Sequence, residues 1–250
     1  MIGFTYDWYS EFLRHCCNSG NVTCLRDVET GPFPQIILRH DVDFDLAAAW
    51  ELSLVEERAG VRSTYLVLLS THYYNAASPK NRTILQDLAR RGFEVGLHFD
   101  PTVYVEDGAE ALSAGFTVER AFLESLVGAE VRSVSVHNPT SHGLYPAFPG
   151  VINAYDPEWF GADRYVSDSL RRWKHDPYTL VSKARDLGRV QVLCHPIHFA
   201  QKETSYTDAL GKMAKNWHTE AHDYIHEKNQ TYRDECSKDS SDSRRGSQLS

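Results

Sequence analysis

Short apolar runs alternate along the chain with longer segments in which apolar residues recur every three or four positions. The runs, rich in β-branched residues, occupy positions 36–38, 61–69, 93–98, 131–136, 165–166 and 189–194. Runs of this kind are typical of strands buried on both faces of a parallel sheet. Helical spacing marks positions 5–18, 45–59, 79–92, 112–126, 177–187 and 205–232. The alternation predicts an α/β fold with crossover helices between parallel strands.

Turn residues and changes in composition divide the chain into four predicted parts. We expect an N-terminal helix and lead-in over 1–34, a barrel-like body over 35–200, a helix within 201–232 packed on the outside of the barrel, and a disordered polar tail over 233–250. A chain of 250 residues with 42% apolar residues has the length and the core of one α/β barrel.

Two aspartates follow the first confident strand, which ends in Arg39-His40-Asp41-Val42-Asp43. Alternate strand positions share a face, so Asp41 and Asp43 are expected to point the same way. Two close carboxylates raise each other's pKa unless a cation lies between them or one takes a proton. One carboxylate can therefore bind a divalent metal while the other acts as a general base. The alternative is a surface turn with two solvated aspartates.

Chemically active side chains also follow the other predicted strands. His98 and Asp100, His137, Asp168 and His195 each stand at or just after a strand's C-terminal end. In barrels of parallel strands the active site is built at that end, from several strands. The pattern predicts one converging site.

The net charge and the cysteine content limit the possible functions of the protein and the cellular compartment in which it is expected. A formal net charge of −8 argues against broad nucleic-acid binding. The five cysteines are odd in number and form no C-x-x-C, which favours a reducing compartment over a disulfide framework. No basic stretch leads into an apolar segment at the N-terminus, and no apolar run has transmembrane length. We expect a cytoplasmic protein without a membrane span.

Three stretches together resemble the polysaccharide deacetylases of the NodB-homology group, carbohydrate esterase family 4. They are Arg39-His40-Asp41-Val42-Asp43, the stretch from Gly92 to His98, and Leu193-Cys194-His195-Pro196. The first is similar to the branch whose first motif reads Arg-His-Asp-Val-Asp, often associated with surface-polysaccharide synthesis. The resemblance covers positions 34–199. It implies a distorted (β/α) barrel of about seven parallel strands, a divalent metal, most often zinc, and removal of N- or O-acetyl groups from sugars.

Carried across residue by residue, the resemblance implies a role for each strand-end residue. Asp41 would be the general base, Asp43 and His98 metal ligands, and His195 the general acid. In this scheme Asp168 orients His195. Arg39 and Arg172 are candidates to steady a carboxylate or bind substrate, and Trp173 is a candidate to stack on a sugar ring. For Asp41 the alternative is a buried salt bridge with Arg39, and for Trp173 it is core packing.

The sequence departs from the family pattern at the third metal ligand. The family places a second histidine four residues after the first, and this chain has Thr102 there. His137 and Asp100 are the two candidate replacements, and we favour His137, because it opens the loop His137-Asn138-Pro139, where the family places a site residue.

The leading hypothesis is therefore a metal-dependent hydrolase acting on an acylated sugar or glycan precursor. A deformylase or other non-peptide C–N hydrolase on the same barrel is one alternative. A non-catalytic carbohydrate-binding or scaffold relative is the other, and Thr102 keeps it open.

Overall fold

The computed structural model describes residues 3–236 and confirms the alternation of strands and helices. The strands are β1 (Asn21–Thr23), β2 (Gln35–Val42), β3 (Thr64–Leu68), β4 (Glu94–Phe99), β5 (Ser133–Val136), β6 (Ile152–Asn153), β7 (Tyr165–Ser167) and β8 (Arg189–Cys194). The helices are α1 (Tyr6–Ser19), α2 (Leu46–Arg58), α3 (Pro79–Arg90), α4 (Ala109–Val127), α5 (Pro139–His142), α6 (Pro177–Ser182), α7 (Ala184–Leu187) and α8 (Tyr206–Lys228). Two compact units result, dividing between Thr204 and Ser205.

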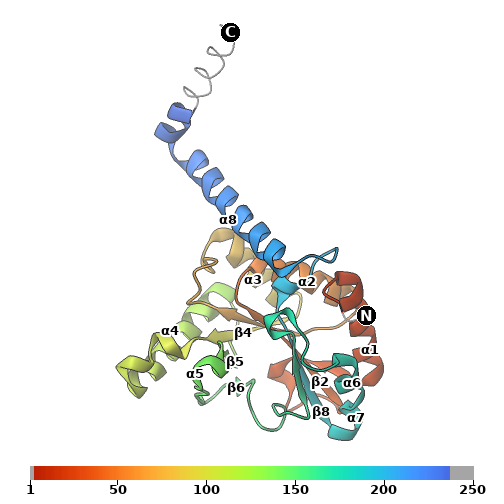
Figure 1. Cartoon of the computed structure of the whole chain (residues 1–250). Helices are drawn as coiled ribbons and strands as arrows, with labels where there is room; N and C mark the ends of the chain where they lie inside the picture. Colours follow the sequence, from red (N-terminus) through yellow and green to blue (C-terminus); the bar gives the residue numbers. More distant parts are fainter. Residues whose placement is uncertain (1–2, 237–250) are drawn as a thin grey trace. The chain divides into compact units, whose positions relative to one another are not determined.

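All pairings in the sheet are parallel, and seven strands follow one another in the order β6-β5-β4-β3-β2-β8-β7 (Figure 1). β1 adds to the N-terminal half of β2. The two end strands, β6 and β7, do not pair with each other. The sheet is nevertheless curled so strongly that the Gln191 side chain of β8 donates a hydrogen bond to the carbonyl of Ala154, just after β6, at 3.0 Å. The predicted distorted (β/α) barrel of about seven parallel strands is confirmed, with a seam between β6 and β7.

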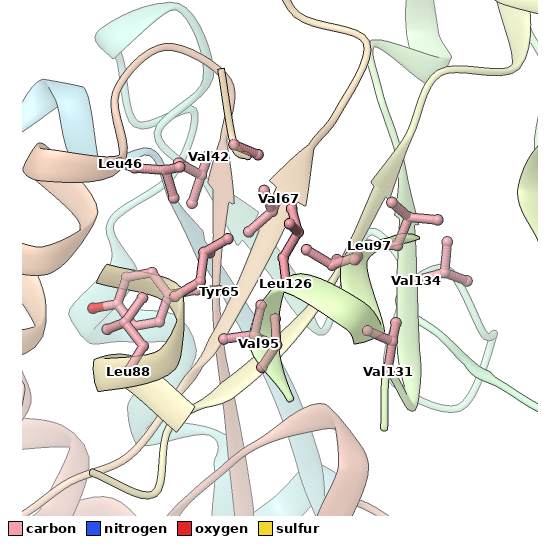
Figure 2. Packing of buried hydrophobic residues seen from close by; sticks show 14 of the residues in the cluster. Val42, Leu46, Tyr65, Val67, Leu88, Val95, Leu97, Leu126, Val131 and Val134 are labelled. Atoms are coloured by element: carbon pink, nitrogen blue, oxygen red, sulfur yellow. The ribbon is translucent and has the colours of Figure 1, made fainter. Parts of the chain in front are cut away.

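Apolar side chains cover the outer face of the sheet. One cluster joins β2 to β5 with α3 and α4, and Figure 2 shows Leu88 and Leu126 from these helices against Tyr65, Val67 and Val95. A second cluster packs α1, α2 and α6 against β2, β7 and β8. A third, smaller cluster around Ile37, Leu66 and Trp159 fills the inside of the barrel. Burial of this apolar surface, at roughly 25 cal/mol per Å2, is the main source of stability.

Strand β2 runs through the middle of the sheet and is buried along its whole length. Its side chains alternate between the two faces. Ile36 and Leu38 belong to the outer cluster, and Ile37 belongs to the inner one. Arg39, Asp41 and Asp43 continue the inner series, so the two aspartates share a face as the sequence predicts.

A buried carboxylate ties β2 to the outer helices through His40. Glu56, in α2, accepts hydrogen bonds from Tyr9 Oη at 2.6 Å and from His40 Nε2, Ser63 Oγ and Tyr65 Oη at 2.7 Å each. All five residues are 0% exposed. Burial alone would raise the pKa of Glu56, but His40 and the hydroxyl donors lower it below its ordinary value.

Gly96 stands where β4 passes closest to its two neighbours. A Cβ there would lie 2.5 Å from the side chains of Leu66 and Ser133 and 2.8 Å from the carbonyl oxygen of Ser133. A glycine lets the strands that carry the site approach this closely.

Some elements differ from the prediction. The predicted helix over 177–187 is two short helices, α6 and α7, because the hydrogen bonding tightens between them, where Lys183 N–H bonds to the carbonyl of Leu180 at 2.9 Å. The two-residue strand β6 was not predicted, since it is too short to show a periodic pattern.

The second unit contains α8, which begins at the cap Ser205 and ends at Asn229. A further helical segment covers 230–236, and the Asn229 side chain accepts from Tyr232 N at its start. Residues 233–236 of the predicted disordered tail are thus helical in the structure, and the remainder of that tail, 237–250, lies outside the described residues. Packing of this helix on the barrel stays a prediction. None of the described helices is long and apolar enough to cross a membrane.

Candidate metal centre

The C-terminal ends of five strands bring the predicted residues together. Asp41 and Asp43 lie at the end of β2, His98 is the penultimate residue of β4, and His137 follows β5. Asp168 follows β7 and His195 follows β8. Parallel strands place these ends on one side of the barrel, and the measured contacts below link all six side chains.

Asp43, His98 and His137 form one compact group. Asp43 Oδ1 lies 3.2 Å from His98 Nε2 and 3.7 Å from His137 Nδ1, and those two ring nitrogens are 3.2 Å apart. One carboxylate oxygen and two imidazole nitrogens within 4.8 Å of one another can hold a metal ion. This donor set suits zinc and similar first-row divalent cations.

The ionisation and the burial of the Asp43 carboxylate fit a cation site. Burial opposes its ionisation, but contacts with His137 and His98 hold the pKa of Asp43 well below its usual range. Its Oδ1 is buried and accepts no well-aligned hydrogen bond from the described residues. A charged, buried oxygen facing two imidazole nitrogens is what a metal would satisfy.

Neighbouring polar groups orient both imidazoles. His98 Nδ1 bonds to Ser135 Oγ at 2.6 Å, which turns Nε2 toward Asp43. The other nitrogen of His137, Nε2, lies 2.9 Å from the Asn138 amide. Metal-binding histidines commonly have such partners on the second nitrogen, because these fix the ring orientation.

Asp41 lies deeper in the barrel than Asp43, and its side chain is 4% exposed. Its Oδ1 accepts from Arg39 Nη1 and from Ser135 Oγ, both at 3.3 Å. Its Oδ2 is 3.9 Å from His98 Nε2, so this oxygen faces the metal group. The buried salt bridge with Arg39 is therefore present, and the role of Asp41 as a general base stays a prediction.

Across from this group, Asp168 is held between two histidines. Its Oδ1 lies 2.6 Å from His195 Nδ1 and its Oδ2 lies 2.9 Å from His198 Nδ1, and both oxygens accept from the backbone N–H of His195 at 3.1 Å. Burial would raise the pKa of Asp168, but the charges of His198 and His195 lower it. Burial would likewise lower the pKa of His195, but Asp168 raises it to about 9.

His195 connects the two halves of the site. Its Nδ1 is occupied by Asp168, and its Nε2 points back toward Asp43 Oδ2 at 3.9 Å. A protonated ring held this way presents an N–H to whatever lies beside the metal group, which is the placement a general acid needs.

The structure separates the two candidates for the third ligand. Asp100 Oδ1 caps a short 3-10 turn, Pro101–Val103, by accepting from Thr102 N at 3.0 Å and from Thr102 Oγ1 at 2.6 Å. His137 lies in the group with Asp43 and His98. Thr102, at the position where the resembled family has a histidine, bonds to this cap, and His137 as the third ligand stays a prediction.

The three predicted substrate-binding residues have different positions. Arg39 is 0% exposed and pairs with the Asp41 carboxylate at 3.3 Å, as expected of a residue that steadies a carboxylate, and its substrate role stays a prediction. Trp173 packs on Phe4 and Trp8 in the outer cluster, with ring centroids 6.4 and 5.9 Å apart, so core packing is its role. Arg172 is exposed, its backbone N–H bonds to the carbonyl of Asp168 at 3.2 Å, and its substrate role stays a prediction.

Sequence reasoning missed Ser135 and His198. Ser135 stands two positions before His137, so the period of a strand could have placed both side chains on one face. His198 stands three positions after His195, and the 3-10 turn Pro196–His198 brings its ring back to Asp168.

Comparison with known proteins gives matches at the level of structure. No protein-family model matches the chain, and no curated protein matches it. The catalytic domain of a peptidoglycan N-acetylglucosamine deacetylase from Eubacterium rectale is 16% identical, over 74% of this chain and 84% of that one, with a TM-score of 0.44. The chitin deacetylase of the fungus Colletotrichum lindemuthianum is 17% identical, over 75% and 83%, with a TM-score of 0.42.

A carbohydrate esterase family 4 pseudoenzyme from Bacillus anthracis is 15% identical over 74% of this chain, with a TM-score of 0.42. The chain spans 60% of the length of that protein, and 63% of a variant of a family 4 pseudoenzyme with restored activity.

Proposed function

We propose that this protein is a metal-dependent hydrolase that removes an acetyl group from a sugar. The single observation that carries the proposal is the arrangement around Asp43, which has two imidazoles on one side and His195 on the other, 3.9 Å from its second oxygen. Asp41 lies beside it. A carboxylate base, a cation site and a protonated imidazole are the groups that amide or ester hydrolysis requires.

In the proposed mechanism Asp43, His98 and His137 would hold a divalent cation, and zinc is the metal we propose. A cation bound there would supply Lewis-acid activation of the attacking water and of the acetyl carbonyl. Asp41 takes the proton of the water as its oxygen bonds to the carbonyl carbon. The bond from that carbon to the sugar nitrogen or oxygen then breaks. His195 donates its proton to the leaving group, and acetate and a free amine or hydroxyl result.

The surrounding residues prepare these two proton transfers. Arg39 and Ser135 hold Asp41 by its Oδ1, which leaves Oδ2 toward the reacting water. Asp168 and its partner His198 keep the His195 ring oriented, and the raised pKa of His195 keeps it protonated at neutral pH. An N- or O-acetylated sugar of surface-polysaccharide metabolism is the proposed substrate class, and a cytoplasmic location stays a prediction.

The test is acetate release from acetylated sugars by the purified protein, its Asp41→Asn variant and a matched Asp100→Asn control. Loss of a general base predicts a fall of about 100-fold to 10,000-fold in kcat for Asp41→Asn, with an unchanged circular dichroism spectrum. Asp100→Asn, which alters a carboxylate outside the group, should keep its activity. Equal activity in Asp41→Asn and the wild type would remove Asp41 from its role.

Two further measurements separate the alternatives. Mass spectrometry of the released acid distinguishes acetate from formate, and formate would indicate a deformylase. Elemental analysis tests the scaffold alternative, which predicts that the protein neither carries nor takes up a divalent metal.

A further inference from the structure

A buried hydroxyl group lies between the proposed base and a proposed metal ligand. Ser135 is 0% exposed, and its Oγ lies 2.6 Å from His98 Nδ1 and 3.3 Å from Asp41 Oδ1. The serine is in β5, and its two partners come from β4 and from the end of β2. A buried group that is hydrogen-bonded to two residues of a site can transmit a change at one of them to the other.

The register of the sheet holds Ser135 at this point. β4 and β5 are parallel, and the Cα atoms of His98 and Ser135 are paired across them. Residues paired in this way have their side chains on the same face of the sheet. The contact between the imidazole and the hydroxyl is therefore set by strand pairing in the buried part of the barrel.

The single hydrogen of the hydroxyl gives the chain of contacts a direction. An ionised Asp41 has no hydrogen to donate, so Ser135 Oγ donates to its Oδ1. Toward His98 the same oxygen can then only accept, and Nδ1 of the imidazole must carry the hydrogen.

This direction selects one tautomer of His98. A neutral imidazole with its hydrogen on Nδ1 has its lone pair on Nε2. That nitrogen lies 3.2 Å from Asp43 Oδ1 and 3.2 Å from His137 Nδ1, where the cation is proposed to bind. The tautomer that can bind a metal is thus the one that an ionised Asp41 selects through Ser135.

We propose that Ser135 is a positioning residue that couples Asp41 to His98, so that an ionised base and a metal-binding imidazole form one linked state of the site. The inference rests on the proposed function for the roles of Asp41 and His98. It goes beyond that function because it makes the metal affinity of the site depend on the base through a residue that binds neither cation nor substrate.

The test measures the zinc affinity of the purified full-length protein by competition with a chelator, and acetate release in the same preparations. The variants are Ser135→Ala, Asp41→Asn and the double variant. Ser135→Ala leaves Asp41 its ion pair with Arg39. Ser133→Ala is the control, because Ser133 lies two positions earlier in β5 and is also 0% exposed. Circular dichroism confirms that each variant folds.

The coupling predicts that Ser135→Ala weakens zinc binding by about 10-fold to 100-fold, whereas Ser133→Ala leaves it unchanged. It also predicts that Asp41→Asn weakens zinc binding by a factor at least about threefold larger in the wild-type background than in the Ser135→Ala background, because the alanine breaks the link. A residue that only supports the fold would give equal factors in the two backgrounds.

Equal factors overturn the inference, and so does wild-type zinc affinity in Ser135→Ala. If the affinities show the coupling but the wild type releases no acetate, the proposed function fails and the coupling stands. If the wild type releases acetate and the two factors are equal, the inference fails and the proposed function stands. A wild-type protein that binds no zinc overturns both.

Discussion

Replacing Glu56 by glutamine should destabilise the protein strongly, although Glu56 lies outside the candidate site. The carboxylate accepts four hydrogen bonds, two on each oxygen. A glutamine keeps one acceptor oxygen and places an NH2 group against the remaining two donors. A hydrogen bond to a charged group contributes about 1.5–3 kcal/mol, so losing two predicts a cost of ~3–6 kcal/mol. The cost lies at the lower end of this range if the neighbouring hydroxyl groups rotate and accept hydrogen bonds from the new NH2 group.

Urea unfolding at several pH values is the assay. The folded-state pKa of Glu56 is lowered, so its carboxylate stabilises the native state above the ordinary glutamate pKa of about 4.3. That stability is lost as the pH falls through the folded-state value. The difference in the free energy of unfolding between the wild type and Glu56→Gln should therefore have its full size at pH 7 and become smaller below about pH 4.

Glu51→Gln is the matched control, because Glu51 lies on the same helix but is exposed. It should change the free energy of unfolding by less than about 0.5 kcal/mol. A Glu56→Gln cost below about 1 kcal/mol at pH 7 would refute the reasoning, as would a cost that stays constant down to pH 3.

Three further predictions concern the site. Gly96→Ala places a methyl group against both neighbouring strands and should cost about 1–3 kcal/mol in thermal unfolding; an unchanged midpoint would contradict the close approach. Asp168→Asn removes the charge that raises the pKa of His195, so the alkaline limit of acetate release should move down by about one pH unit or more, and an unmoved limit would contradict that role. His137→Ala should weaken zinc binding by about 100-fold or more in a chelator competition while Asp100→Asn leaves it unchanged; the reverse order would make Asp100 the ligand.

The secondary-structure elements, and the face of the sheet on which the site residues lie, were predictable from the sequence because both depend on local periodicity. Apolar runs located six of the strands, and parallel topology then implied that their C-terminal ends meet. The period of two in β2 placed Asp41 and Asp43 on one face without any knowledge of the partner strands.

Roles that depend on packing were not predictable in the same way. Trp173 and Arg39 were suitable for sugar binding by residue type, and only the folded structure shows that one is in the outer cluster and the other inside the barrel. Glu56 stands among Leu52 and Val55 on a helix, and the sequence does not reveal that its four donors come from three other segments, namely α1, β2 and the start of β3.

The alternation along β2 also limits how this chain can change in length. Odd-numbered positions from Gln35 to Asp43 face the inside of the barrel, and His40 between them is bound to Glu56 outside. Inserting or deleting one residue between Gln35 and Arg39 would exchange the faces, directing His40 inward and both carboxylates toward the helices. A substitution in this strand changes one side chain, whereas a single-codon indel would displace the acidic pair and the His40 anchor together.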